Sequence, residues 1–216
     1  FINYYAHILE FSHKRAFSFI NKDTKSYGYN EDIFFQFSNE EKKQAEKFLE
    51  NLGLNSSDSW ICIHNRDSSY LNEKFPELKR EQQNSYRNFP INTMIKSVKY
   101  FIENGFHVFR VGLISKEKLN FDSKHYHDFS NDAENKNTIN PLYILSKCKA
   151  YFGGDGGVNT IPTLFNRPVS HINFSMYDIH LLTHYKTLPT IIKRIRSKNG
   201  KLLSLEEIFK KNLHKK

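Results

Sequence analysis

The segment from Cys148 to Pro168 constrains the fold more than any other part of this chain. Residues 150–152 are apolar and predict a short buried strand, four glycines around Asp155 predict a tight turn, and a helix is expected to begin near Val158. Glycines permit positive φ angles and let a ligand approach the main chain closely. The N–H groups at a helix N-terminus attract anions. Taken alone, the segment predicts either a phosphate site or a simple chain reversal.

From Trp60 onward, short apolar runs alternate with longer segments of helical periodicity. This alternation is typical of βαβ units and a parallel sheet. We therefore predict an α/β fold that is Rossmann-like, with a mainly parallel sheet flanked by helices. Strands are expected at 60–65, 106–111, 126–129, 150–152 and 168–174, and helices at 89–104, 141–147 and 158–165.

The first 54 residues differ from the rest of the chain. The first 37 are rich in aromatic residues without a clear period, and a capping pattern at Ser38 begins an amphipathic helix that Gly53 ends. We expect residues 1–54 to be the remnant of a preceding domain or a linker, and residues 55–216 to form a ligand-binding domain. The chain begins at Phe1 rather than Met, which favours a fragment of a longer protein.

Charge and composition narrow the classes of partner. The net charge of +9 permits nucleic acid, an anionic membrane surface or a phosphorylated ligand. The basic C-terminus is either a solvated helix face or a patch that faces acidic headgroups, so peripheral membrane contact stays open. Nucleic acid is not expected, because no zinc-finger, recognition-helix or RNP signature is present. Cys62 and Cys148 lack metal-site spacing and are expected to be buried reduced thiols in a cytoplasmic protein, located there or at the inner face of the membrane.

Polar and glycine residues follow the predicted strands. The strand ends read His64–Asp67, Arg110–Gly112, Gly153–Gly157 and Asn173. Parallel α/β sheets bind ligands at the carboxyl ends of their strands. We therefore expect these four segments to meet at one edge of the sheet.

The segment after the first strand offers groups for binding and proton transfer. Arg66 can bind a diphosphate through two parallel hydrogen bonds. Asp67 has three open roles: to orient Arg66, to accept a proton from a sugar hydroxyl, or to cap a turn. His64 is either a general base or a hydrogen-bonded structural residue. Arg87 precedes a predicted helix and can reach toward a phosphate.

Other candidates lie on later strands and on the glycine turn. A charge at Arg110, inside a strand, is costly without a partner, so it either pairs with a carboxylate such as Asp128 or faces an anionic ligand. Asp155 is expected to bond backbone N–H groups or a ribose hydroxyl, and Asn159 and Thr160 to reach a phosphate. No metal site and no cofactor are predicted, because Asp155 has no Asp-x-Asp partner and the alternating His125 and His127 lack a third ligand in the sequence.

The ordered motifs resemble a known family. A strand ending in His-x-Arg-Asp-x-x-Tyr, then Tyr-Arg-Asn before a helix, Gly-Phe-x-Val-x-Arg-x-Gly, and Cys-x-x-Tyr-Phe-Gly-x-x-Gly-Gly are similar to bacterial glycosyltransferases encoded among surface-polysaccharide genes. More distantly they resemble fucosyltransferase-like proteins of the GT-B class. The resemblance covers roughly residues 37–209, although Asn65 stands where the family often has a hydrophobic residue.

The resemblance implies a metal-independent, GT-B C-terminal-type domain that binds a nucleotide-diphosphate sugar. It implies a glycan or lipid-linked glycan acceptor that binds mainly in an N-terminal domain. The predicted catalytic residues are His64 and Asp67, and the predicted nucleotide-sugar contacts are Arg66, Tyr70, Arg87, Arg110, Gly112, Gly154, Asp155, Gly156, Gly157, Asn159 and Thr160.

Three functions remain open at this point. The first is a glycosyltransferase, or its donor-binding half, and we expect an enzyme. The second is a non-catalytic domain that binds a nucleotide or sugar phosphate, and the third is a basic module for an anionic membrane surface. A dinucleotide oxidoreductase is not favoured, because the glycine turn comes late and lacks the Gly-x-Gly-x-x-Gly register.

Overall fold

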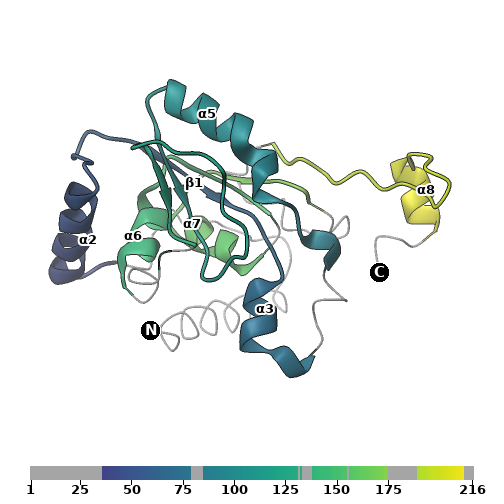
Figure 1. Cartoon of the computed structure of the whole chain (residues 1–216), viewed down its shortest axis with the longest axis horizontal. Helices are drawn as coiled ribbons and strands as arrows, with labels where there is room; N and C mark the ends of the chain where they lie inside the picture. The colour runs from purple at the N-terminus through teal and green to yellow at the C-terminus, as the bar shows by residue number, and fades with distance from the viewer. Residues whose placement is uncertain are drawn as a thin grey trace, which may run out of the picture. The chain divides into compact units, whose positions relative to one another are not determined.

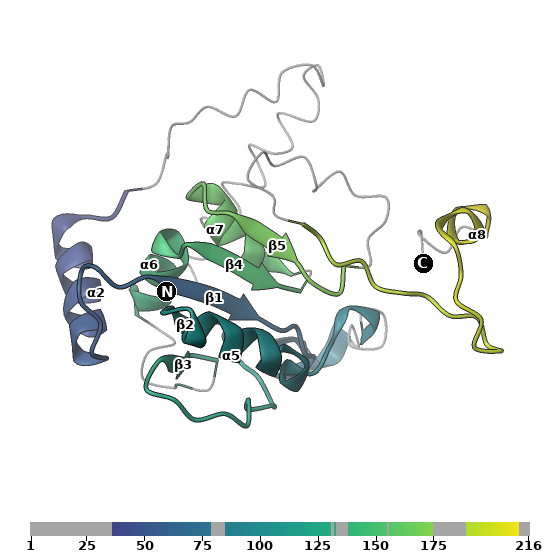
Figure 2. The same ribbon diagram turned by 90° about the horizontal axis from the view of Figure 1, so that it is seen from above.

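The computed structural model describes residues 36–78, 85–130, 132, 138–154, 156–174 and 189–211. A five-stranded sheet lies at the centre of these residues, in the order β3-β2-β1-β4-β5 (Figures 1 and 2). Every neighbouring pair of strands is parallel. The predicted α/β, Rossmann-like fold class is therefore confirmed. The strands are β1 (Trp60–His64), β2 (His107–Arg110), β3 (Tyr126–Asp128), β4 (Ala150–Gly153) and β5 (Val169–His171).

Helices cover both faces of the sheet. The α5 side of the core contains Ile61 and Ile63 of β1 together with Val98 of the helix. On the opposite side the Trp60 indole donates a hydrogen bond of 2.9 Å to the carbonyl of Ile144 in α6. Alternate residues of β1 thus serve the two layers, as the period of a strand requires. The helices are α2 (Asn39–Asn51), α3 (Ser69–Lys74), α5 (Ile95–Glu103), α6 (Asn140–Lys147), α7 (Thr160–Leu164) and α8 (Leu205–Lys210), and the short 3₁₀ turns are η1 (Pro76–Leu78), η2 (Ser85–Arg87), η3 (Ile91–Met94) and η4 (Gly157–Asn159).

Three predicted elements differ from the prediction at one end. The helix predicted from Phe89 begins as the 3₁₀ turn η3 at Ile91 and becomes α5 at Ile95, because Pro90 is extended and the Phe89 N–H donates to the Arg66 carbonyl at 3.2 Å. The helix predicted from Val158 begins as the 3₁₀ turn η4. The last predicted strand ends at His171, because Asn173 has a left-handed φ of 55°.

The helix predicted after Ser38 is present as α2, with both hydrogen bonds of a capping box between Ser38 and Glu41. It packs against the sheet domain: the Phe48 ring lies 5.5 Å from that of Phe129, and the Tyr143 hydroxyl donates to Glu46 at 3.3 Å. The division of the chain at residue 54 stays a prediction. Both cysteines are free and buried, as the sequence predicts.

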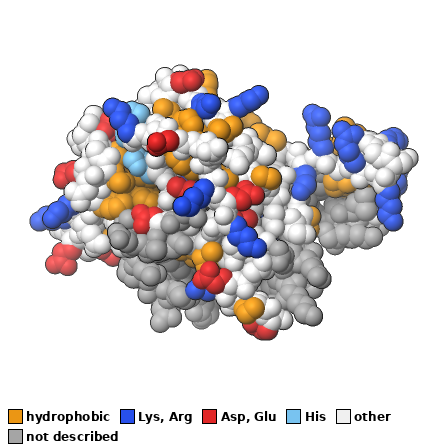
Figure 3. All heavy atoms as spheres, in the orientation of Figure 1, with side chains coloured by type: hydrophobic (Ala, Val, Ile, Leu, Met, Phe, Trp, Pro, Cys, Tyr) orange, Lys and Arg blue, Asp and Glu red, His pale blue; other side chains and the backbone are white. Residues whose placement is uncertain are grey.

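Residues 189–211, the C-terminal arm, begin beside β5 and run away from the sheet to α8 (Figure 2). The arm begins as an extension of the sheet, where Ile191 N–H donates to the His171 carbonyl at 2.8 Å. Further on, a turn bridges Arg196 and Leu202. Figure 3 shows Lys and Arg side chains gathered over this part of the surface.

Candidate functional site

The strand order reverses between β1 and β4. The chain builds β1, β2 and β3 toward one edge of the sheet and then β4 and β5 toward the other. The ends of β1 and β4 lie side by side, with His64 paired to Gly153 and the Gly154 N–H donating to the His64 carbonyl at 3.1 Å. Loops that diverge at such a reversal leave a crevice in which parallel α/β folds bind ligands. Because all five strands are parallel, the four predicted segments share this edge, as expected.

The His64 imidazole lies between two glycines. A Cβ atom on Gly112 would lie 3.6 Å from its Cδ2, and one on Gly156 would lie 3.8 Å from its Cε1. Gly112 also has a φ of 153°, which side chains rarely adopt, so both space and conformation favour glycine there. The Nδ1 atom of His64 is buried and has no hydrogen-bond partner among the described residues.

Burial, followed by the positive charge of Arg110, lowers the pKa of His64 to about 4, and the opposing effect of Asp67 is smaller. The imidazole is therefore neutral at pH 7. A neutral imidazole donates one hydrogen bond and accepts another, so it can bind a ligand hydroxyl or a phosphate oxygen.

Glycine is favoured in this turn because the main chain lies close to neighbouring groups, and not because φ is positive. A Cβ on Gly154 would meet the Phe89 ring at 2.7 Å. Gly156 has an extended φ of −175°, so the expectation of positive φ is wrong for the described glycines of this turn. Gly157 is exposed, and a Cβ there would meet nothing within 4 Å, which leaves its main chain accessible to a ligand. Asp155 lies outside the described residues.

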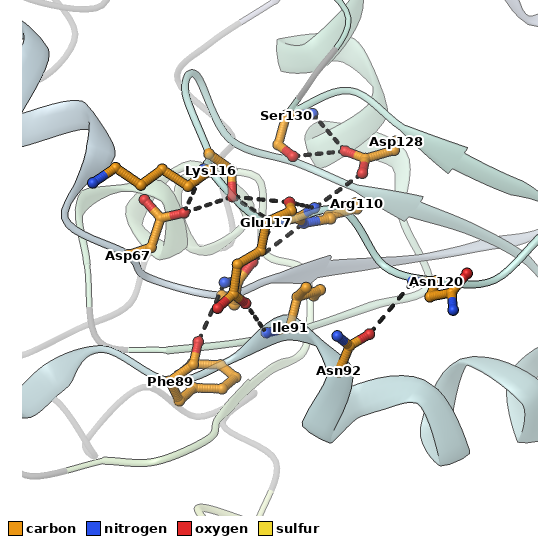
Figure 4. A network of polar contacts seen from close by, with 12 residues as sticks. Asp67, Phe89, Ile91, Asn92, Arg110, Lys116, Glu117, Asn120, Asp128 and Ser130 are labelled. Carbon is orange, nitrogen blue, oxygen red and sulfur yellow. Dashed lines mark hydrogen bonds and ion pairs between the residues drawn. The ribbon is translucent and has the colours of Figure 1, made fainter.

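Arg110 is fully buried, and all five of its N–H donors are engaged (Figure 4). Nε and Nη2 donate to Asn65 Oδ1 at 3.2 and 2.8 Å, and Nη2 also donates to Ser115 Oγ at 2.6 Å. Nη1 donates to the Glu117 carbonyl at 2.6 Å and to Asp128 Oδ2 at 2.9 Å. Of the two roles open from the sequence, the ion pair with Asp128 is the one observed. No donor of Arg110 is left for a nucleotide sugar.

Asp67 belongs to the same network. Its Oδ2 accepts hydrogen bonds from Ser115 Oγ at 2.6 Å and Lys116 N–H at 3.1 Å, and its Oδ1 accepts one from Ser69 N–H at 2.9 Å. Burial raises the pKa of Asp67, but these hydrogen bonds outweigh burial and hold the pKa below its ordinary value. A carboxylate stabilised in this way is a weak base, so the geometry favours the turn-capping role over a catalytic one.

The two candidate phosphate ligands, Arg66 and Arg87, are brought to the same edge by backbone contacts. Arg66 donates a hydrogen bond to the side chain of Asn88. The Asn173 amide donates to the Arg87 carbonyl at 3.3 Å, which ties η2 to the end of β5. Both arginine side chains are half-buried. Both residues therefore lie at the carboxyl edge of the sheet.

The remaining predicted residues fall in two places. Asn159 and Thr160 lie at the junction of η4 and α7, and the Asn159 amide lies 3.3 Å from His171 Nδ1 at the end of β5. Tyr70 lies on α3, where its exposed ring pairs with that of Phe75 at 6.3 Å between centroids. The structure therefore places Asn159 and Thr160 at the carboxyl edge and gives Tyr70 a local aromatic partner.

Sequence reasoning missed the residues that organise the site. Asn65 is buried and connects Arg110 to the Phe89 carbonyl, to which its amide donates at 3.2 Å. Glu117 accepts a hydrogen bond from Ile91 N–H at 2.9 Å and thereby fixes the start of η3. The one available signal was the polar Asn65 where the family pattern has a hydrophobic residue. Ser115 and Glu117 lie in a polar loop without periodicity.

A group of three histidines consists of His107 on β2, His127 on β3, and His125 directly before β3. His107 Nδ1 lies 3.1 Å from His127 Nε2, and His107 Nε2 lies 3.2 Å from His125 Nδ1. The neighbours meet opposite nitrogens of His107, so the three rings do not converge on one point. Within the described ranges, no three His, Cys, Asp or Glu side chains are arranged to hold a metal ion. Burial, followed by the charges of His107 and His125, lowers the pKa of His127 to about 4.

The fold is similar to that of two glycosyltransferases. One is E. coli ADP-heptose LPS heptosyltransferase II, at 16% sequence identity and a TM-score of 0.52 over 84% of this chain and 51% of that one. The other is a glycosyl transferase family 9 protein from Veillonella parvula DSM 2008, at 14% identity and a TM-score of 0.50 over 73% of this chain and 41% of that one. The chain spans about half or less of their length, and at this identity the likeness concerns the fold. No family model and no curated protein matches the sequence.

Proposed function

We propose that this chain is the donor-binding part of a glycosyltransferase, of GT-B C-terminal type. It binds a nucleotide-diphosphate sugar, and the sugar passes to a glycan or lipid-linked glycan acceptor of a cell surface. The observation that carries the proposal is the β1–β4 reversal, where the main chain of Arg66 lies beside Gly154 and the main chain of Gly157 is exposed. The likeness of the fold to glycosyltransferases is consistent with it.

The diphosphate is the part of the donor that this edge suits best. Arg66 and Arg87 supply positive charge for the phosphates. Gly156 and Gly157 have no side chains, so the phosphates can come close to the main chain there. Guanidinium groups bind phosphate oxygens through paired, charge-assisted hydrogen bonds. Asn159, Thr160 and Asp155 follow or lie within the glycine turn, and we assign them to the phosphates and the ribose. Because the arginines neutralise the charge that develops on the leaving diphosphate, we propose that no metal ion is needed.

His64 is the candidate for proton transfer. With a pKa of about 4 the free protein holds it neutral but weakly basic. A diphosphate bound beside the ring places negative charge near it, and such charge raises the pKa of an imidazole. Donor binding would therefore move His64 toward the range in which general bases work.

Two measurements test the proposal. Calorimetry with UDP, GDP, ADP and CDP should show binding of at least one nucleotide, whereas NAD should not bind. Arg66→Ala should weaken that binding at least about tenfold, because one charge-assisted hydrogen bond contributes about 1.5–3 kcal/mol. Arg194→Ala, on the exposed C-terminal arm, is the matched control and should bind normally.

Absence of binding by every nucleotide would refute the proposal. Unchanged affinity in a folded Arg66→Ala protein would move the site away from this edge. Binding without release of sugar from any nucleotide sugar, even in the presence of an acceptor domain, would favour the non-catalytic domain.

We place the protein in the cytoplasm, at the inner face of the membrane, where nucleotide sugars meet lipid-linked acceptors. Within the described part of the chain, no helix has the length and apolar character that a bilayer span requires.

A further inference from the structure

The C-terminal arm concentrates exposed apolar side chains. Ten large hydrophobic side chains are exposed among the described residues, and five of them lie between residues 191 and 209. Ile191 is 61% exposed and Leu205 is 55% exposed, and the other three are Ile192, Leu202 and Phe209. The turn and α8 also line a shallow, open pocket of about 230 Å³, with Ile195, Leu203 and Ile208 in its lining. A monomeric protein seldom gathers so much apolar surface on a short segment without using it.

The same arm is strongly basic. Residues 189–211 contain seven Lys or Arg and two Glu, so the arm carries a net charge of +5 out of +9 for the whole chain. Both acids are already paired, Glu207 with Lys201 at 2.8 Å and Glu206 with Lys210 at 2.6 Å. Figure 3 shows these basic groups on the part of the surface that contains α8. The arm therefore presents apolar side chains within a positive field.

The combination of exposed apolar and basic side chains favours a bilayer over a protein as the partner of the arm. Five of the seven basic residues are Lys, a residue that is depleted in protein–protein interfaces. Lys and Arg beside an anionic leaflet are each attracted by about 1 kcal/mol, and exposed Ile, Leu and Phe side chains insert at the headgroup boundary. We propose that the C-terminal arm docks the protein on an anionic lipid surface, with Ile191 and Leu205 entering the interface and the basic residues contacting headgroups. The arm begins beside the β5 end of the candidate site, where Lys193 donates a hydrogen bond to the Tyr86 carbonyl, so vesicle binding is measured without nucleotide.

The test is flotation of the full chain with vesicles of phosphatidylglycerol and phosphatidylcholine in equal parts, and with vesicles of phosphatidylcholine alone. The double variant Arg194→Gln/Lys198→Gln should bind the anionic vesicles about 30-fold more weakly, since two headgroup attractions are lost. Lys43→Gln/Lys47→Gln removes the same charge from the exposed face of α2 and should bind like the unaltered protein.

A second pair of variants tests the apolar contribution. Ile191→Ser/Leu205→Ser should weaken binding at least about tenfold at raised salt, where headgroup attraction is screened. Tyr100→Ser, which alters a side chain of α5 that is 62% exposed, is the control and should have no effect.

Equal losses in the α2 and arm charge variants would overturn the proposal, because they would indicate general attraction by net charge. Equal binding to neutral and anionic vesicles would also overturn it. A third outcome would overturn it as well: the unaltered chain sediments as a dimer and does not bind vesicles, and the Ile191→Ser/Leu205→Ser variant sediments as a monomer. The arm would then bind a second copy of the chain.

Discussion

Replacing Arg110 by Lys tests whether one buried guanidinium holds the carboxyl edge of the sheet together. The five donors of Arg110 reach four acceptors, on Asn65, Ser115, Glu117 and Asp128. A Lys ammonium has three donors at one point, so the paired contact to Asn65 and at least one further acceptor are lost. At about 1–2 kcal/mol for each, the free energy of unfolding should fall by about 2–4 kcal/mol. For a domain of this size that corresponds to a fall in Tm of about 4–16 °C.

Urea unfolding followed by circular dichroism measures the change, and calorimetry gives the Tm. Arg196→Lys is the control, because Arg196 is exposed and donates to the Gly200 carbonyl at 2.8 Å, and its replacement should cost less than about 0.5 kcal/mol. Equal stabilities of the two variants would refute the structural role. A stable Arg110→Lys protein with weakened nucleotide binding would restore the ligand contact that the sequence left open.

Three further predictions concern the crevice, the histidine group and metal ions. Gly154→Ala should lower the free energy of unfolding by about 1–3 kcal/mol, because its Cβ would lie 2.7 Å from the Phe89 ring. Gly157→Ala, where nothing lies within 4 Å, should leave the stability unchanged, and equal urea midpoints of the two variants would contradict this. Because burial lowers the pKa of folded His127 to about 4, its contribution to stability is complete above the ordinary pKa of about 6.5 and is lost as pH falls toward 4. With solvent screening this loss is about 1–2 kcal/mol, and His127→Phe should reduce the slope of stability between pH 6.5 and 4, of which His64 retains a part; an unchanged slope would count against it. Any transferase activity should persist in EDTA, and a strict requirement for Mn²⁺ or Mg²⁺ would show that a metal ion assists the diphosphate.

The sequence predicted the parallel sheet and the edge on which the candidate site lies, because apolar periodicity and strand ends are local signals. It could not assign Arg110, since the choice between Asp128 and a ligand depends on a contact between residues 18 apart in the sequence. Asn65 and Glu117 were missed for the same reason. The partners of the Asn65 side chain lie 24 and 45 residues away in the sequence, and the partner of the Glu117 carboxylate lies 26 residues away. The glycine turn was located correctly, but its cause is the space taken by the Phe89 ring, which no local pattern reveals.

The two cysteines give the protein a practical property. Cys62 and Cys148 have no exposed surface, and burial raises the pKa of the Cys62 thiol well above its ordinary value. Because the thiolate is the reactive form, maleimide reagents should leave both untouched while the chain is folded. A single cysteine introduced at Lys198 would thus carry a fluorophore on the otherwise natural sequence, and the delayed labelling of Cys62 and Cys148 would time global unfolding in the same sample.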